Sequence, residues 1–144
     1  MPVIKKDDVT KTKIAKLLNS AAIETRLDDD DDGVYAEKGG IDFGVFVKLI
    51  PETSQVKLWT YMQCKDGVST DALSEFVCKL NSDYILVKFT HSTYEDGRAF
   101  VNGEYDTFCT FGLSSENFIV TLKMFAEIFV SSIREEDKED VFFS

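Results

Sequence analysis

Apolar residues recur at helical spacing in three segments of this chain. Residues 8–22 and 70–81 place an apolar side chain at about every third or fourth position, which is typical of a helix with one buried face. A third segment runs from Ser114 or Ser115, either of which suits a helix N-cap, to about residue 136. The positions that define the first two helices are Ile14, Leu17, Leu18, Ala21, Leu73, Phe76, Val77 and Leu80.

Between these helices, apolar and polar residues alternate, as they do in strands that are covered on one face only. In one such strand, Phe43, Val45, Val47 and Leu49 alternate onto the same side. Strands are predicted over residues 23–27, 34–38, 43–49, 55–63, 85–94 and 99–111. Turns are expected at residues 28–33, Gly39-Gly40, residues 51–54 and the strong hairpin signal Asp96-Gly97.

The order α-β-β-β-β-α-β-β-α predicts an α+β fold with a mostly antiparallel sheet and helices packed on one face. The length of 144 residues is that of one domain. We therefore expect residues 1–144 to form a single domain, with a core of about residues 7–136 and an acidic C-terminal tail of residues 137–144.

Charge limits the classes of partner. Sixteen basic residues against 26 acidic ones leave a net charge of -10, whereas nucleic acids and anionic membranes are bound through Lys and Arg. Neither is expected as a partner. Because no signal peptide or membrane-spanning stretch is recognisable, we expect a cytoplasmic protein in which Cys64, Cys78 and Cys109 are reduced thiols.

Asp28, Asp30, Asp32 and Gly33 imitate the opening of a calcium-binding EF-hand loop, in which alternating oxygen ligands precede a glycine. The imitation fails at Gly39, which stands where the loop needs a bidentate glutamate, and the flanking segments are predicted strands. The run is therefore interpreted as a solvated acidic turn, and no metal site is assigned.

Nucleophilic catalysis at neutral pH would depend on His91, the single histidine of the chain. His91 lies inside a predicted strand, and no nucleophile-elbow motif accompanies it. The cysteines lack zinc-site spacing, and no glycine-rich phosphate-binding motif is found. The sequence therefore indicates no catalytic residue, no cofactor and no enzyme activity.

The last predicted helix has two apolar rows. A broad row from Phe118 to Ile133 suits a core-facing stripe, and a second row on the opposite side consists of Val120, Met124 and Ile128. One sheet covers one side of a helix, so the second row needs another surface. That surface is a partner or a second copy of the chain, or another helix of the same domain, or else the tail folds back and places Val141, Phe142 and Phe143 there.

A second candidate surface consists of Phe46, Trp59 and Tyr61, which are predicted on the sheet face away from the helices. Large aromatic side chains are common at binding hot spots. Aromatic pairs between strands also stabilise an exposed sheet, so both interpretations stay open.

Three segments carry a family resemblance. They are Ile14-Ala15-Lys16-Leu17-Leu18 leading to Val45-Phe46-Val47, then Leu80-Asn81 with Tyr84 and Val87-Lys88-Phe89, and finally Leu113-Ser114-Ser115-Glu116-Asn117-Phe118. Over about residues 7–136 the chain resembles the YbjN-like family of bacterial sensory transduction regulators. That family is similar in fold to the type III secretion chaperones, which are small acidic proteins that dimerise and hold an extended stretch of an effector protein.

The resemblance implies a non-catalytic regulatory or chaperone-like module of the bacterial cytoplasm. We expect it to bind a protein partner, and to form a homodimer, through Val120, Met124, Ile128, Phe46, Trp59 and Tyr61. The alternative is a small-molecule or Ca-ion sensing domain, with its ligand in the sheet concavity or at the aspartate turn.

Overall fold

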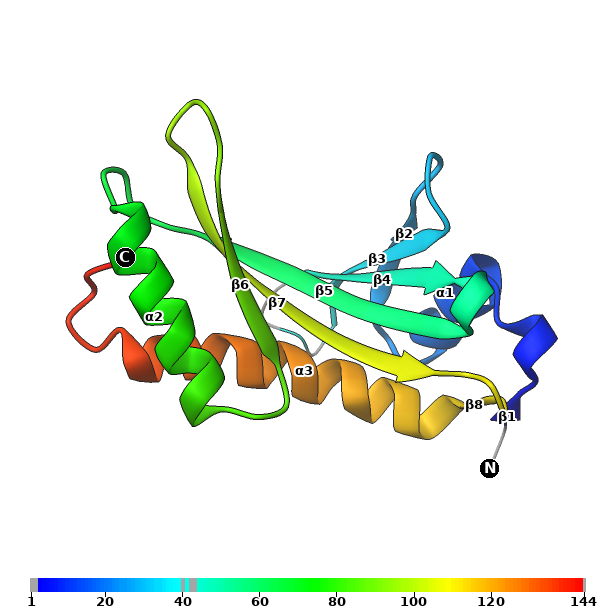
Figure 1. The fold of residues 1–144 in the computed structure, drawn as a ribbon. Coiled ribbons are helices and arrows are strands. Elements are labelled where there is room, and N and C mark those ends of the chain that lie inside the picture. Colours follow the sequence, from blue (N-terminus) through cyan, green and yellow to red (C-terminus); the bar gives the residue numbers. More distant parts are fainter. Residues whose placement is uncertain (1–2, 40, 42–43, 144) are drawn as a thin grey trace.

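The computed structural model describes residues 3–39, 41 and 44–143. They form a twisted six-stranded sheet with helices packed beneath it (Figure 1). The strand order is β2-β3-β4-β5-β7-β6, and every neighbouring pair is antiparallel, which confirms the predicted α+β fold. The elements are β1 (Val3–Ile4), η1 (Lys6–Asp8), α1 (Lys11–Ser20), β2 (Glu24–Leu27), β3 (Gly33–Lys38), β4 (Val45–Ile50), η2 (Pro51–Thr53), β5 (Gln55–Gln63), α2 (Thr70–Asp83), β6 (Lys88–Thr93), β7 (Ala99–Phe108), β8 (Leu113–Ser114) and α3 (Ser115–Glu136).

The first helix is shorter than the predicted residues 8–22. It begins after Thr10, whose hydroxyl accepts a hydrogen bond from the Lys13 N–H at 3.2 Å, as an N-cap does. It ends before Ala22, whose φ of 63° is incompatible with a continuing right-handed helix. The predictions that concern Gly40 and Phe43 lie outside the described residues.

The last hairpin also differs from its predicted bounds. β6 begins at Lys88 rather than residue 85, because the exposed Ile85 and Leu86 belong to the loop before it. β7 ends at Phe108, and residues Leu113–Ser114 instead form β8, which pairs with β1 in a separate two-stranded sheet. The sequence pattern did not indicate this small sheet.

Helix α3 lies along the covered face of the sheet and packs a phenylalanine ring against it (Figure 1). The fully buried Phe129 ring stacks on Phe89 of β6, with ring centroids 5.9 Å apart. A Cβ atom at Gly103 of β7 would overlap the Phe129 ring, so this glycine lets the helix approach the sheet. Within the described residues, no helix is apolar over a sufficient length to cross a bilayer.

The segment after α3 packs against the domain. The buried Asp137 carboxylate accepts hydrogen bonds from the N–H groups of Val141, Phe142 and Phe143 at 2.8, 3.2 and 2.9 Å. The Phe142 ring lies 4.4 Å from the Phe76 ring of α2, centroid to centroid, and Phe143 is buried in the core. We call residues 137–143 the C-terminal strap. It folds back onto α2, so the structure does not support the alternative in which the tail covers the second row of α3.

Candidate functional site

The sheet face opposite the helices carries a continuous group of aromatic side chains, which we call the aromatic patch. In the strand register, Phe46 lies directly opposite Tyr35 on one side and Trp59 on the other. The corresponding ring centroids are 4.5 and 4.9 Å apart. The patch continues from Trp59 to Tyr61 at 5.3 Å and from Tyr61 to Phe100 at 5.5 Å. The aromatic patch therefore consists of Tyr35, Phe46, Trp59, Tyr61 and Phe100.

Strand alternation accounts for the position of the patch. Val45, Val47 and Leu49 of β4 are buried against the helices, so Phe46 between them points to the opposite face. Gly44 completes this arrangement, because a Cβ atom there would overlap the ring and hydroxyl of Tyr35. In β4, the helix side thus takes aliphatic residues, and the open side takes a ring.

The structure brings together the three predicted residues of this surface, Phe46, Trp59 and Tyr61, and adds two more. Tyr61 is 42% exposed, whereas Phe46 and Trp59 are half-buried by their aromatic neighbours. Tyr35 and Phe100 were missed because each is recognisable only from the register between strands. The alternation within its own strand places Tyr35 on the open face, but it does not show which residues of the next strand Tyr35 contacts.

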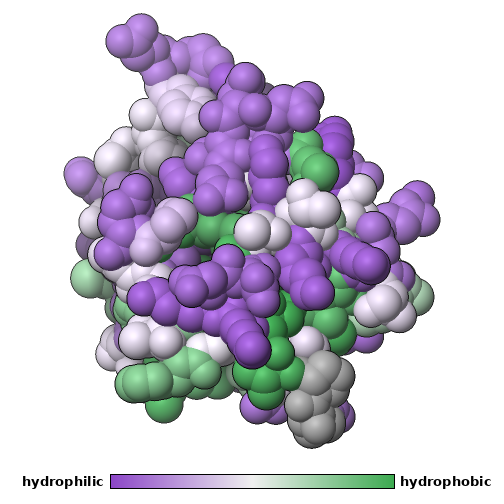
Figure 2. Space-filling model, turned by 90° about the vertical axis from the view of Figure 1, so that its right-hand side faces the viewer, coloured by the Kyte–Doolittle hydropathy of each residue, from purple (hydrophilic) through white to green (hydrophobic). Residues whose placement is uncertain are grey.

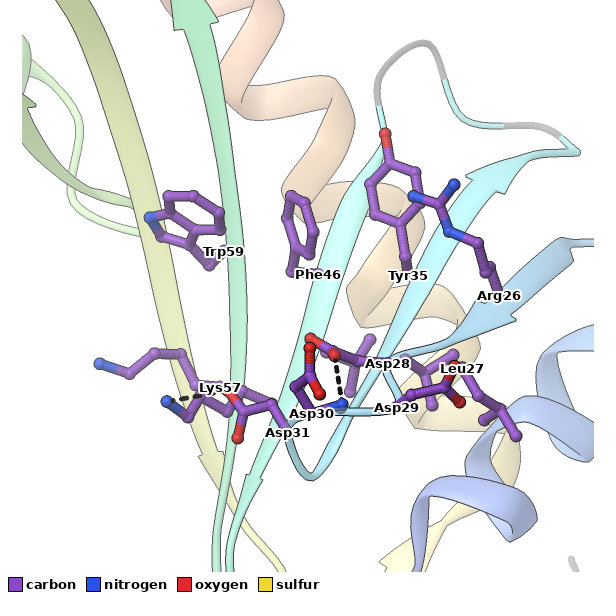
Figure 3. A pocket seen from close by; sticks show the side chains of 14 residues that line it. Arg26, Leu27, Asp28, Asp29, Asp30, Asp31, Tyr35, Phe46, Lys57 and Trp59 are labelled. Atoms are coloured by element: carbon purple, nitrogen blue, oxygen red, sulfur yellow. Dashed lines mark hydrogen bonds and ion pairs between the residues drawn. The ribbon is translucent and has the colours of Figure 1, made fainter.

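Beside the patch, the turn between β2 and β3 encloses one side of an open hollow of about 670 Å³ (Figure 3). The rings of Tyr35, Phe46 and Trp59 stand along one wall, and Asp28, Asp29, Asp30 and Asp31 lie below them. Hence the hollow joins an apolar aromatic surface to a concentration of negative charge.

The acidic turn is held by contacts of its own. The Asp28 carboxylate accepts the Asp30 N–H at 3.0 Å, and Asp31 pairs with Lys48 at 3.3 Å. The Asp32 N–H, and next the Lys48 ammonium, hold the pKa of Asp31 below its usual range. Among the described residues, no three histidine, cysteine or carboxylate side chains converge as a metal site would require.

The second row of α3 is partly open to solvent. Val120 is 58% exposed and Met124 is 37% exposed, whereas Ile128 is half-buried against the core. Figure 2 views the molecule from the end at which α1 lies, and apolar residues gather along its lower edge below a mostly hydrophilic area. The role of this row in association stays a prediction, carried chiefly by its first two residues.

The groups considered for nucleophilic chemistry are dispersed. His91 lies in the edge strand β6 opposite Val101, and Cys78 is an exposed residue of α2. Burial, and next the negative charge of Asp137, raises the pKa of the Cys64 thiol to about 11. A reactive cysteine has the opposite property, because its thiolate is stabilised near neutral pH.

Solved structures of other proteins share this fold. YbjN from E. coli, described as "a putative transcription regulator", superposes with a TM-score of 0.74 at 12% identity, covering 92% of this chain and 94% of that one. An uncharacterized protein from Methanothermobacter thermautotrophicus gives a TM-score of 0.65 at 13% identity, covering 90% of this chain and 97% of its own. At such low identities, these likenesses establish the shared fold alone.

The sequence itself establishes the family. No curated protein matches it. Residues 10–135 match the model of the YbjN family, whose description is "Putative bacterial sensory transduction regulator". The description supports a regulatory role, and the match confirms the resemblance noted from the sequence. This chain belongs to the YbjN family of bacterial regulators.

Proposed function

We propose that this protein is a non-catalytic regulatory module of the bacterial cytoplasm that binds a segment of a partner protein across the open face of its sheet. The observation that carries the proposal is the aromatic patch, which the helices leave uncovered. Aromatic side chains combine a large apolar area with few rotatable bonds, and they dominate the energetics of many protein interfaces. A chaperone-like hold on an extended segment is one form of such binding.

The edges of the sheet favour binding across the face over strand addition. At the β6 edge, the Asn81 side chain donates to the Phe89 carbonyl and accepts the Phe89 N–H, both at 2.8 Å. Asn81 thus takes the place of a neighbouring strand at that position. The opposite edge strand, β2, has only 4 residues. The open face is therefore the larger surface available to an extended segment.

Site-specific crosslinking in native cells tests this proposal. A photoreactive phenylalanine analogue at Tyr61 is expected to crosslink to a partner protein, and Phe46→Ala together with Trp59→Ala should abolish that crosslink. The matched control carries the analogue at Phe111, which is 99% exposed but lies outside the aromatic patch. Crosslinks that survive loss of both rings, or that form equally from residue 111, would contradict the proposal.

The dimer is the second part of the proposal, and its occupant is a second copy of the chain. Val120 and Met124 remain exposed because the C-terminal strap packs on α2 instead. Apolar residues that repeat one helical turn apart form a row that a symmetry-related helix can cover.

Light scattering of the purified protein decides whether this row associates. The double variant Val120→Glu, Met124→Glu should lower the molar mass from dimer to monomer while the circular dichroism spectrum is unchanged. Lys123→Glu on the same helix changes the net charge by the same amount and should leave the mass as it is. An unchanged mass in the double variant would reject this row as a dimer surface.

A further inference from the structure

The wall of the hollow already holds one guanidinium group of the chain itself. The Arg26 guanidinium carbon lies 5.1 Å from the centroid of the Tyr35 ring, while its Nη1 atom lies 3.5 Å from a carboxylate oxygen of Glu37. The contact with the ring is a cation–π contact, because the π face of the ring is negative and attracts the guanidinium. The carboxylate of Glu37 attracts the same group. Phe46 and Trp59 continue the same wall beyond Tyr35 (Figure 3).

The cations that line the hollow have carboxylate partners of their own. Lys48 pairs with Asp31 at 3.3 Å, and Lys57 lies 3.5 Å from Glu104 and 4.0 Å from Asp106. The Lys11 ammonium donates to the main-chain carbonyl of Asp28 at 2.7 Å and so offsets part of the charge of the turn.

The carboxylates are in excess. In the part of the chain that the structure describes, no ion pair involves Asp28, Asp29 or Asp30, and all three line the hollow. Even with Lys11 counted against one of them, the hollow keeps an uncompensated negative charge next to two aromatic rings. Its complement is a cation carried on a partly apolar stem.

We propose that this hollow recognises an arginine side chain of the partner segment. The guanidinium packs against Phe46 and Trp59 and faces the carboxylates of Asp28, Asp29 and Asp30, while flanking apolar residues of the segment contact Tyr61. Arginine suits this site because its planar cation stacks on rings and donates to carboxylates at once. The inference rests on the proposed function and adds the chemistry of the partner to it.

Trp59 is the single tryptophan of the chain and lines the hollow, so its emission reports occupancy directly. The probe is the peptide acetyl-Gly-Val-Arg-Val-Gly-amide, compared with the same peptide carrying the neutral isostere citrulline. The arginine peptide is expected to bind at least about tenfold more tightly, which corresponds to about 1.4 kcal/mol. Phe46→Ala, which keeps the Trp59 reporter, should weaken binding of the arginine peptide.

Two triple variants separate a local contact from the overall charge. Asp28→Asn, Asp29→Asn, Asp30→Asn retains the side-chain acceptor that the turn uses and should remove most of the preference for arginine. Glu75→Gln, Glu127→Gln, Glu139→Gln neutralises three exposed carboxylates on the helices and the strap and should retain it. Equal losses in the two variants would overturn the proposal, because net charge alone would then account for the preference.

The remaining outcomes distinguish this inference from the proposed function. Equal binding of the arginine and citrulline peptides, or no change in Trp59 emission with either at about 1 mM, overturns the arginine site, while the Tyr61 crosslink continues to support binding on the open face. Spermine that binds as tightly as the arginine peptide would indicate a free-cation site and would also overturn it. Loss of both the crosslink and the emission change would reject the open face itself.

Discussion

The two faces of the sheet are formed by the same strands, but their side chains differ in how completely they are buried. On the covered face, Val47 and Leu58 lie opposite each other and are fully buried between the sheet and the helices. One position along, on the open face, Phe46 lies opposite Trp59 and both rings keep contact with solvent. Aliphatic side chains give the first face a close-packed interior, whereas rings give the second a surface that is rigid and only partly desolvated.

Burial, rather than side-chain type, separates the residues that stabilise the fold from those that are available for binding. A phenylalanine is present on each face, and each has aromatic neighbours. Only the covered one has lost all contact with water. The covered face should therefore determine the free energy of unfolding, and the open face should determine affinity for the partner.

The largest expected effect on the free energy of unfolding comes from truncating a phenylalanine of the covered face, compared with one of the open face. Phe129→Ala removes a fully buried ring from the contact between α3 and the sheet and should lower the free energy of unfolding by about 3–5 kcal/mol. Phe46→Ala should cost less than half as much, because its ring is half-exposed. Urea denaturation of both variants measures the difference. Similar losses would show that the open face is a second structural core.

A second pair of phenylalanines tests whether the C-terminal strap belongs to the covered side. Phe143 is 8% exposed within the core, whereas Phe111 is 99% exposed. Phe143→Ser should lower the free energy of unfolding by about 1.5–3 kcal/mol, since burial of a phenylalanine contributes that much. Phe111→Ser is the matched control and should leave it almost unchanged. Equal thermal midpoints of the two variants would mean that the strap adds nothing to the core.

Two glycines make the same comparison from the backbone. A Cβ atom at Gly103 would overlap the buried Phe129 ring, and one at Gly44 would overlap Tyr35 on the open face. Phe129 is enclosed and has no room to move, so Gly103→Ala should cost about 1–3 kcal/mol, as overpacking does. Tyr35 has solvent beside it and can swing outward, so Gly44→Ala should be nearly neutral. Paired denaturation curves measure both, and a neutral Gly103→Ala would contradict the close approach of α3.

Most of the fold follows from local patterns in the sequence. The alternation at Val45, Val47 and Leu49 and the helical spacing in α3 fix which side of each element is buried. Helix bounds were predicted less well, because they depend on single residues such as Ala22 with its positive φ. The small β1–β8 sheet was missed, since two-residue strands have no periodicity to detect.

The candidate site was only half predictable, because it depends on register and on charge pairing in space. Phe46, Trp59 and Tyr61 could be assigned to the open face from the alternation within their own strands, so three members of the patch were recognised. The contact of Tyr35 with Phe46 requires the β3–β4 register. The excess charge of the turn is equally hidden in the sequence, where Asp31 looks no different from Asp30, although only Asp31 pairs with Lys48 among the described residues.

The smallest expected effect concerns the reactivity of the thiols, which depends on how well the fold excludes solvent and reagents from them. Cys64 is buried and its pKa is raised to about 11, whereas Cys78 is exposed on α2. A thiol reagent should therefore label Cys78 quickly and Cys64 only after opening of the structure.

The same pKa sets the sign of a pH effect on stability. The folded state holds the Cys64 proton more tightly than the unfolded chain, in which the thiol pKa is ~8.5. The free energy of unfolding therefore falls as the pH rises from the pKa of the unfolded chain to the folded-state pKa of about 11. Reagent kinetics with Cys78→Ser isolate the buried thiols. Phe143→Ser should speed the labelling of Cys64 by loosening the strap, because the Lys65 N–H next to Cys64 donates to the Phe142 carbonyl at 2.8 Å. Rapid labelling of Cys64 in the otherwise native Cys78→Ser variant would show that the strap does not close this side of the sheet.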